Sequence, residues 1–174
     1  QNHGVTFAVK AGRSLIADDM GLGKTLQAIA TAEVMKNLSG MKTVLVICPT
    51  SLKYQWKSEI EKFTNSTITI VEGNLLQREL IYKNDTSFYK IVSYNAAIRD
   101  VAFINKMQFD LLILDEAQRI KNWQTVTAKS IKNIQTKYCV VLTGTPLENK
   151  LEELYSIIQM IDPLKLGAMF RFVY

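Results

Sequence analysis

The segment Thr43–Cys48 (TVLVIC) is the feature that most restricts how this chain can fold. A continuous run of apolar and β-branched residues is typical of a strand that is buried on both faces. Such strands occur in parallel sheets that are covered by helices on either side. The proline that follows the run, Pro49, ends it. The segment therefore predicts a central strand of a layered α/β domain.

Similar runs recur along the chain and are separated by stretches with helical spacing. Strands are predicted at Ser14–Ala17, Thr43–Cys48, Thr67–Val71, Lys90–Ser93, Leu111–Leu114 and Tyr138–Leu142. Helices are predicted at about Thr25–Leu38, from a cap at Ser51 to about Phe63, at Leu75–Tyr82 and at Leu151–Ile161. This alternation indicates βαβ units, so we expect an α/β fold of three layers, a parallel sheet with helices on both faces. Ligands of such sheets bind beyond the carboxyl ends of the strands.

Composition excludes several other classes of protein. The chain has 174 residues, 48% hydrophobic and 21% charged, which is ordinary for one globular domain. It has neither an apolar run of the ~18–20 residues that span a membrane nor a signal-peptide pattern, so we expect a soluble intracellular protein without a membrane partner. Cys48 and Cys139 lie in apolar runs and are predicted to be buried free thiols. Because His3 is the only histidine, histidine-based metal or triad chemistry is not expected. The net charge of +5 suits nucleic acid but is also common for solubility alone.

The octapeptide DDMGLGKT, residues 18–25, follows a predicted strand and opens a predicted helix. This is the context of a phosphate-binding P-loop, because glycines let backbone N–H groups point at phosphate and a helix N-terminus favours anions. Lys24 is expected to reach the β- and γ-phosphates, and the Thr25 hydroxyl to ligate Mg²⁺. The loop is a variant, since it begins with aspartate where the general pattern has glycine. The residues expected to contact the nucleotide here are Asp19, Met20, Gly21, Leu22, Gly23, Lys24 and Thr25.

Two carboxylates, Asp115 and Glu116, end the predicted strand Leu111–Leu114. Beside a P-loop, Asp115 can hold Mg²⁺, commonly through a water, and Glu116 can polarise the attacking water as general base. An ordinary solvent-exposed strand end is the alternative, and the P-loop makes that alternative remote. Carboxylate, hydroxyl and phosphate oxygens are the ligands that Mg²⁺ prefers. We therefore expect ATP and Mg²⁺ as cofactors and Lys24, Asp115 and Glu116 as the catalytic residues.

Further motifs carry a resemblance to a known family. ADDMGLGKT (residues 17–25), DEAQRIKN (115–122) and LTGTPLEN (142–149) resemble motifs I, II and III of the Swi/Snf family of superfamily-two DNA-dependent ATPases. Residues 46–56 resemble motif Ia, residues 91–100 resemble motif Ib, and the opening QNHGVTFAV resembles the adenine-recognising segment. The resemblance implies that residues 1–174 form the N-terminal RecA-like lobe of a longer motor. Its second lobe would supply arginines that stabilise transition-state charge.

The resemblance also implies roles for single residues. Gln1 would contact adenine. The residues that would couple the nucleotide state to DNA are Gln118, Thr143, Gly144 and Thr145. Gln118 stands where the family most often has histidine; glutamine can keep a hydrogen bond to motif III but cannot titrate. The residues that would lie along a double-stranded DNA backbone, without reading sequence, are Thr50, Ser51, Ser93, Tyr94, Lys121 and Asn122.

Several residues have a simpler interpretation as well. Thr50 and Ser51 can cap the following helix, Tyr94 can be a half-buried packing residue, and Trp56 suits a helix core better than a base-stacking platform. An RNA helicase lobe is a rival, but it would show PTREL-like, DEAD and SAT motifs where this chain has PTSLK, DEAQ and TGT. A non-catalytic scaffold is the other rival, although it would have no need to keep the catalytic residues. We expect a double-stranded-DNA-dependent ATPase in a bacterial cytoplasm, or else a nucleus, and little turnover from this lobe alone.

Overall fold

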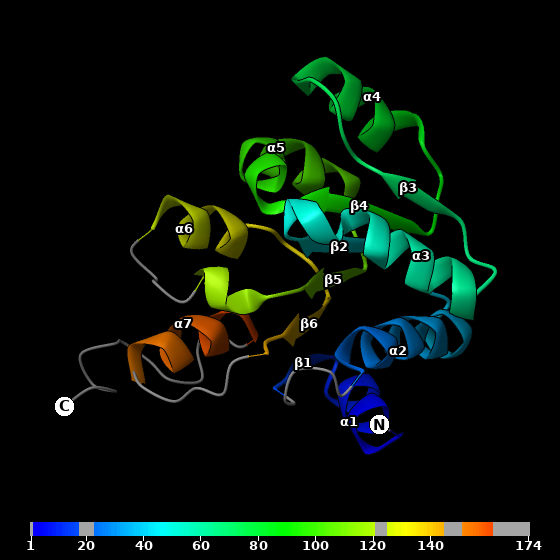
Figure 1. Ribbon diagram of the computed structural model, residues 1–174, viewed down its shortest axis with the longest axis vertical. Coiled ribbons are helices and arrows are strands. Elements are labelled where there is room, and N and C mark those ends of the chain that lie inside the picture. The colour runs from blue at the N-terminus through cyan, green and yellow to red at the C-terminus, as the bar shows by residue number, and fades with distance from the viewer. Residues whose placement is uncertain (1, 18–22, 121–124, 145–150, 162–174) are drawn as a thin grey trace.

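The computed structural model describes residues 2–17, 23–120, 125–144 and 151–161 (Figure 1). Six parallel strands form one sheet in the order β1-β6-β5-β2-β4-β3. They are β1 (Arg13–Ile16), β2 (Val44–Cys48), β3 (Ile68–Ile70), β4 (Tyr89–Ser93), β5 (Leu111–Leu114) and β6 (Tyr138–Leu142). The six predicted strands are thus confirmed, each within one residue at either end.

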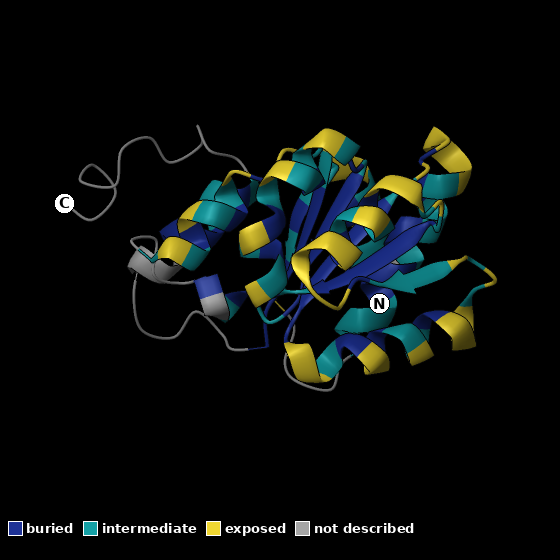
Figure 2. Ribbon diagram, turned by 90° about the horizontal axis from the view of Figure 1, so that it is seen from above, coloured by how far each residue is buried: buried dark blue, intermediate teal, exposed yellow. Residues whose placement is uncertain are grey.

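Helices cover both faces of the sheet. They are α1 (Asn2–Ala11), α2 (Lys24–Ser39), α3 (Lys53–Phe63), α4 (Leu75–Asn84), α5 (Tyr94–Met107), α6 (Val126–Lys132) and α7 (Leu151–Ile161), with short 3-10 turns η1 (Thr50–Leu52) and η2 (Ala117–Ile120). Strand side chains alternate between two cores: Val44 and Val46 pack towards α2 and α3, while Leu45 and Ile47 pack towards α5. Figure 2 shows the resulting layers, with dark blue buried strands between helices that are yellow on their outer sides. The predicted three-layer α/β fold is confirmed. None of the described helices is long and apolar enough to cross a membrane.

Three described helices were not predicted, and one predicted cap is wrong. α1 and α5 overlap the segments that resemble the adenine-recognising segment and motif Ib, and α6 lies between those that resemble motifs II and III. The expected cap at Ser51 fails because Thr50–Leu52 turn as a 3-10 segment after Pro49. α3 therefore begins at Lys53, and no side chain caps it. The predicted helix at Leu75 is confirmed and longer than expected, and it begins with a reciprocal capping box between Asn74 and Gln77.

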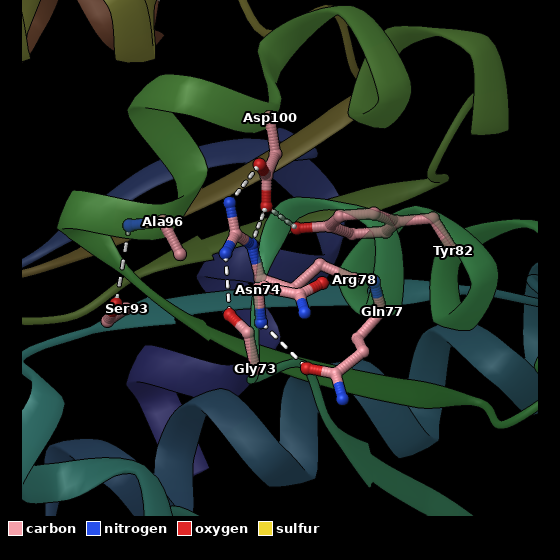
Figure 3. A network of polar contacts seen from close by, with 8 residues as sticks. All are labelled: Gly73, Asn74, Gln77, Arg78, Tyr82, Ser93, Ala96 and Asp100. Carbon is pink, nitrogen blue, oxygen red and sulfur yellow. Dashed lines mark hydrogen bonds and ion pairs between the residues drawn. The ribbon is translucent and has the colours of Figure 1, made fainter.

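A buried ion pair fixes α4 against α5 (Figure 3). Arg78 donates from Nε and Nη2 to the two carboxylate oxygens of Asp100, at 2.7 and 2.8 Å. Its Nη1 donates to the Gly73 carbonyl at 2.8 Å, and the Tyr82 hydroxyl donates to Asp100 at 3.4 Å. Hydrogen bonding to Asp100 raises the pKa of Arg78, so the guanidinium stays charged. Since α5 starts at the end of β4, this pair also helps to fix the helix that begins beside the candidate site.

Candidate active site

The conspicuous polar motifs follow neighbouring strands and meet at one edge of the sheet. In spatial order, the chain after β1 leads to Gly23 and Lys24 at the start of α2, the residues after β6 include Thr143, and those after β5 are Asp115 and Glu116. The residues after β2 and β4 are Thr50 and the start of α5. Because all strands are parallel, these carboxyl ends lie on the same side of the sheet, where α/β domains bind ligands.

The start of α2 has the geometry that a phosphate-binding loop needs. Gly23 caps the helix with φ 76° and ψ 34°, in the left-handed region that glycine adopts at little cost. Lys24 and Thr25 form the first turn, where helical N–H groups have no partners within the helix. Together with the helix dipole, these N–H groups make the end of α2 suitable for anionic oxygens.

A pocket of about 410 Å³ opens between the start of α2, one side of α3 and the end of β5. Its volume lies within the range of small-molecule sites, roughly 300–1,000 Å³. The pocket unites all three residues predicted to be catalytic. Its lining residues are Gly23, Lys24, Thr25, Leu26, Leu52, Gln55, Trp56, Glu59, Phe63, Asp115 and Glu116.

Asp115 is held firmly although it is largely buried, with 8% of its surface exposed. Its Oδ2 accepts a hydrogen bond from the indole Nε1 of Trp56 at 2.8 Å, and its Oδ1 accepts one from the backbone N–H of Glu116 at 2.9 Å. Burial raises the pKa of Asp115, as does the neighbouring carboxylate of Glu116, while Trp56 and Lys24 oppose the rise. The site thus concentrates negative charge where water is scarce, which favours a bound cation.

Glu116 stands in an unusual backbone conformation, with φ 52°. Residues other than glycine rarely occupy this left-handed region, and such strain gathers at functional sites. Its carboxylate Oε2 accepts a hydrogen bond from Nε2 of Gln118. The Oε1 of Gln118 in turn accepts one from the hydroxyl of Thr143 at 3.2 Å. The residue at the end of β5 is therefore connected to the end of β6 through Gln118.

The two cysteines are free and buried, as predicted. Burial, with the negative charge of Asp115 as a smaller contribution, raises the pKa of the Cys48 thiol to about 12. Burial likewise raises the pKa of Cys139 to about 11. Both thiols therefore stay protonated at neutral pH and pack as small apolar groups. Within the described residues, no cluster of three or more histidine, cysteine, aspartate or glutamate side chains suits a metal ion.

Comparison with known proteins agrees with this arrangement. The model of the SNF2-related domain matches residues 1–173. The chain belongs to this family. An uncharacterized ATP-dependent helicase of Mycoplasma genitalium is 36% identical over 160 residues, which cover 91% of this chain and 16% of that protein. The DNA repair and recombination protein RAD54B of Gallus gallus is 33% identical, with coverage of 92% and 19%. The chain thus spans less than a fifth of these relatives.

A solved structure shows the same fold. The Sulfolobus solfataricus SWI2/SNF2 ATPase core in complex with double-stranded DNA superimposes with a TM-score of 0.87 at 33% identity. The match covers 98% of this chain and 36% of that one. The chain accordingly has the RecA-like fold of an SNF2-type ATPase core, and its relatives include helicases and chromatin-remodelling ATPases.

Among the residues that the SNF2 resemblance places along DNA, the four that the structure describes fall into two groups. Thr50 and Ser51 are exposed in η1, where a DNA backbone can reach them. Ser93 is half-buried, and its Oγ accepts a hydrogen bond from the Ala96 N–H, so it caps α5. Tyr94 is 3% exposed and donates from its hydroxyl to the Asp115 carbonyl, so its side chain is a packing residue rather than a direct DNA contact. The exposed pair therefore remains the candidate for direct contact.

Some predicted residues of this SNF2-type site lie outside the described residues. They are Gln1, Asp19, Met20, Gly21, Leu22, Lys121, Asn122 and Thr145. Gly144 is described and buried at the end of β6, next to Thr143.

Sequence reasoning assigned Trp56 to the core, and the structure confirms that it is buried, with 1% exposed. It missed the hydrogen bond to Asp115. A usable signal existed, because a buried indole N–H requires an acceptor.

Proposed function

We propose that this chain is the N-terminal ATP-binding lobe of a motor that couples ATP hydrolysis to movement along double-stranded DNA. The observation that carries the proposal is the hydrogen-bonded chain from Glu116 through Gln118 to Thr143. It connects the candidate general base to the segment after β6 that the family resemblance makes the coupling motif. A lobe that only bound nucleotide would have no need of such a connection.

Mg²⁺ suits the residues that line the pocket. Thr25 offers a hydroxyl and Asp115 a carboxylate, and the two line the same cavity. With only these two ligands from the chain, the remaining positions would be filled by phosphate oxygens and water, as Mg²⁺ prefers. The cation would also offset the repulsion between the Asp115 and Glu116 carboxylates that helps to raise the pKa of Asp115. When bound with ATP, the ion would neutralise charge that develops on the phosphates.

The chain's own residues divide the remaining work. Lys24, in the first turn of α2, binds the β- and γ-phosphates beside the helix N-terminus. Glu116 orients a water and accepts its proton, and the hydrogen bond from Gln118 keeps its carboxylate in place. A second lobe of the parent protein is expected to supply an arginine, which is typically worth ~10³–10⁵ in rate. Without that lobe, the isolated chain should bind nucleotide but hydrolyse it poorly.

The choice of double-stranded DNA rests on two supports. Thr50 and Ser51 are exposed hydroxyls beside the site and suit backbone contacts that ignore sequence. The similar Sulfolobus core is described in complex with double-stranded DNA, and it shares 33% of its sequence with this chain. We place the protein in a bacterial cytoplasm, because the Mycoplasma genitalium helicase shares 36% identity with it and the Gallus gallus RAD54B protein 33%.

The direct test measures ATP hydrolysis by the full-length parent protein with double-stranded DNA, single-stranded DNA and RNA in parallel. We expect duplex DNA to stimulate ATP hydrolysis strongly, because bound duplex DNA would complete the coupling that we assign to Thr143. The lobe of residues 1–174 by itself is the matched comparison and should show little turnover. Stimulation by RNA alone would replace the proposal with an RNA helicase, and inactivity under all conditions would favour a scaffold.

The link through Gln118 gives a second prediction. Gln118→Ala removes both hydrogen bonds at once, so duplex DNA should stimulate hydrolysis by the full-length protein several-fold less than in the wild type. Gln118→His can restore a link to Thr143, and it should make stimulation depend on pH between about 5 and 8, where histidine titrates. Stimulation ratios measured across that pH range check both variants. If Gln118→Ala keeps the wild-type ratio, the link does not couple the two sites.

A further inference from the structure

Asp115 accepts hydrogen bonds from two aromatic side chains, which belong to two different helices. Trp56 of α3 donates from Nε1 to the carboxylate Oδ2 at 2.8 Å. Tyr94 of α5 donates from its hydroxyl to the backbone carbonyl at 2.8 Å. Both aromatic residues are buried, with 1% and 3% of their surfaces exposed, so water competes little for either bond. The Trp56 bond goes to a carboxylate, and hydrogen bonds to charged groups in such surroundings are the stronger kind.

The two contacts come from opposite faces of the sheet. Trp56 belongs to the core beneath α2 and α3, and Tyr94 belongs to the core beneath α5. Figure 1 shows α3 and α5 on either side of β2 and β4. Between them, the backbone N–H of Asp115 donates to the Ile47 carbonyl of β2 at 2.9 Å. A shift of either helix relative to the sheet must therefore move the carboxylate or the carbonyl of Asp115.

Trp56 lies directly behind the exposed segment that we place along DNA. Thr50 and Ser51 are exposed in η1, and α3 follows at once, so Trp56 lies within its first two turns. On the other side Ser93 caps α5, and Tyr94 is the first residue of that helix. A displacement of η1 by DNA thus reaches Asp115 through the first turns of α3, while Tyr94 holds the Asp115 backbone from α5.

We propose that Trp56 and Tyr94 are positioning residues that make the carboxylate of Asp115, which would hold Mg²⁺, respond to DNA bound at η1. This inference rests on the proposed function. It adds a route from DNA to the nucleotide that is separate from the Gln118 link. Partners that orient a metal ligand typically change metal affinity or activity by about 10–100-fold when removed.

The experiment measures binding rather than turnover. A fluorescent, non-hydrolysable ATP analogue is bound to the full-length protein while Mg²⁺ is titrated, with and without duplex DNA. In the wild type we expect DNA to lower the Mg²⁺ concentration at half-maximal binding. In Trp56→Phe and Tyr94→Phe that concentration should rise about 10-fold or more, and the effect of DNA on it should shrink.

Two control variants separate positioning from loss of packing. Tyr82→Phe removes another buried tyrosine hydroxyl that bonds an aspartate, Asp100, away from the pocket. Ile60→Ala opens space on the same helix as Trp56 without removing a hydrogen bond. Both controls should keep the wild-type Mg²⁺ dependence and its response to DNA. If Trp56→Phe fails to fold, Tyr94→Phe decides, because it loses only one oxygen atom.

The outcomes distinguish this inference from the function beneath it. A wild type that hydrolyses ATP faster with duplex DNA, with both aromatic variants titrating as the wild type does, overturns the inference alone. A wild type that ignores DNA in hydrolysis and in binding overturns the proposed function and the inference together. Coupling receives its strictest test in Asp115→Asn, where adding Tyr94→Phe should change the Mg²⁺ dependence much less than in the wild type.

Discussion

Glu116→Gln is expected to slow DNA-stimulated ATP hydrolysis by about 10²–10⁴-fold, the usual contribution of a positioned general base. Glutamine has nearly the shape of glutamate, and its amide oxygen can still accept the hydrogen bond that Gln118 donates to Glu116. The change therefore removes the proton acceptor and leaves the link to Thr143 in place. Binding of ATP should change little, because Lys24 and the start of α2 hold the phosphates.

The measurement is the single-turnover hydrolysis rate of the full-length protein, together with the dissociation constant of ATP. Glu59→Gln is the matched control, since Glu59 lines the same pocket from α3. It should keep a rate close to the wild type. If Glu116→Gln and Glu59→Gln slow hydrolysis equally, Glu116 is not the base. If Glu116→Gln mainly weakens ATP binding, its role is electrostatic.

Features set by local sequence could be predicted, whereas features set by contacts between distant residues could not. The strands β2, β5 and β6 were predictable, because continuous burial on both faces leaves only apolar residues along each strand. The meeting of Lys24, Asp115 and Glu116 was predictable too, since parallel strands bring their carboxyl ends together. In these cases local pattern and topology point the same way.

The remainder depended on contacts between residues distant in sequence. Trp56 and Asp115 are 59 residues apart, so the sequence around either residue does not predict their hydrogen bond. The burial of Tyr94 follows from its bond to the same aspartate, 21 residues away. The predicted cap at Ser51 is wrong for a local reason, because Thr50–Leu52 form a 3-10 turn before α3 begins. Residues that touch the ligand were therefore easier to find than residues that hold those residues in place.

Arg78→Met is expected to destabilise the chain by about 3–5 kcal/mol, because it leaves the Asp100 carboxylate buried without its partner. Asp100 has no exposed surface, and two of the three Arg78 nitrogens bond to it. Methionine keeps most of the apolar stem, so the loss reports on charge rather than on packing. Urea unfolding, followed by the midpoint and its slope, measures the change in the free energy of unfolding.

The matched control is Lys57→Met on α3. Lys57 lies 3.7 Å from Glu61, and both side chains are more than 40% exposed, at 43% and 57%. Solvent-exposed pairs of this kind are worth about 0–1 kcal/mol, so this variant should unfold almost as the wild type does. Equal effects of the two variants would contradict the assignment of Arg78 and Asp100 as a buried pair.

A double variant tests whether the Arg78–Asp100 ion pair itself stabilises the fold, or whether stability is lost only when one partner is removed. In Arg78→Met combined with Asp100→Leu, no charge is left buried, and much of the lost stability should return. If it does, the charged pair serves chiefly to specify how α4 meets α5, since apolar residues can fill the same space. Because α5 begins with Tyr94, that specification also sets where the Tyr94 hydroxyl meets Asp115. If the double variant regains stability but duplex DNA stimulates its ATP hydrolysis less than that of the wild type, the ion pair is retained for geometry.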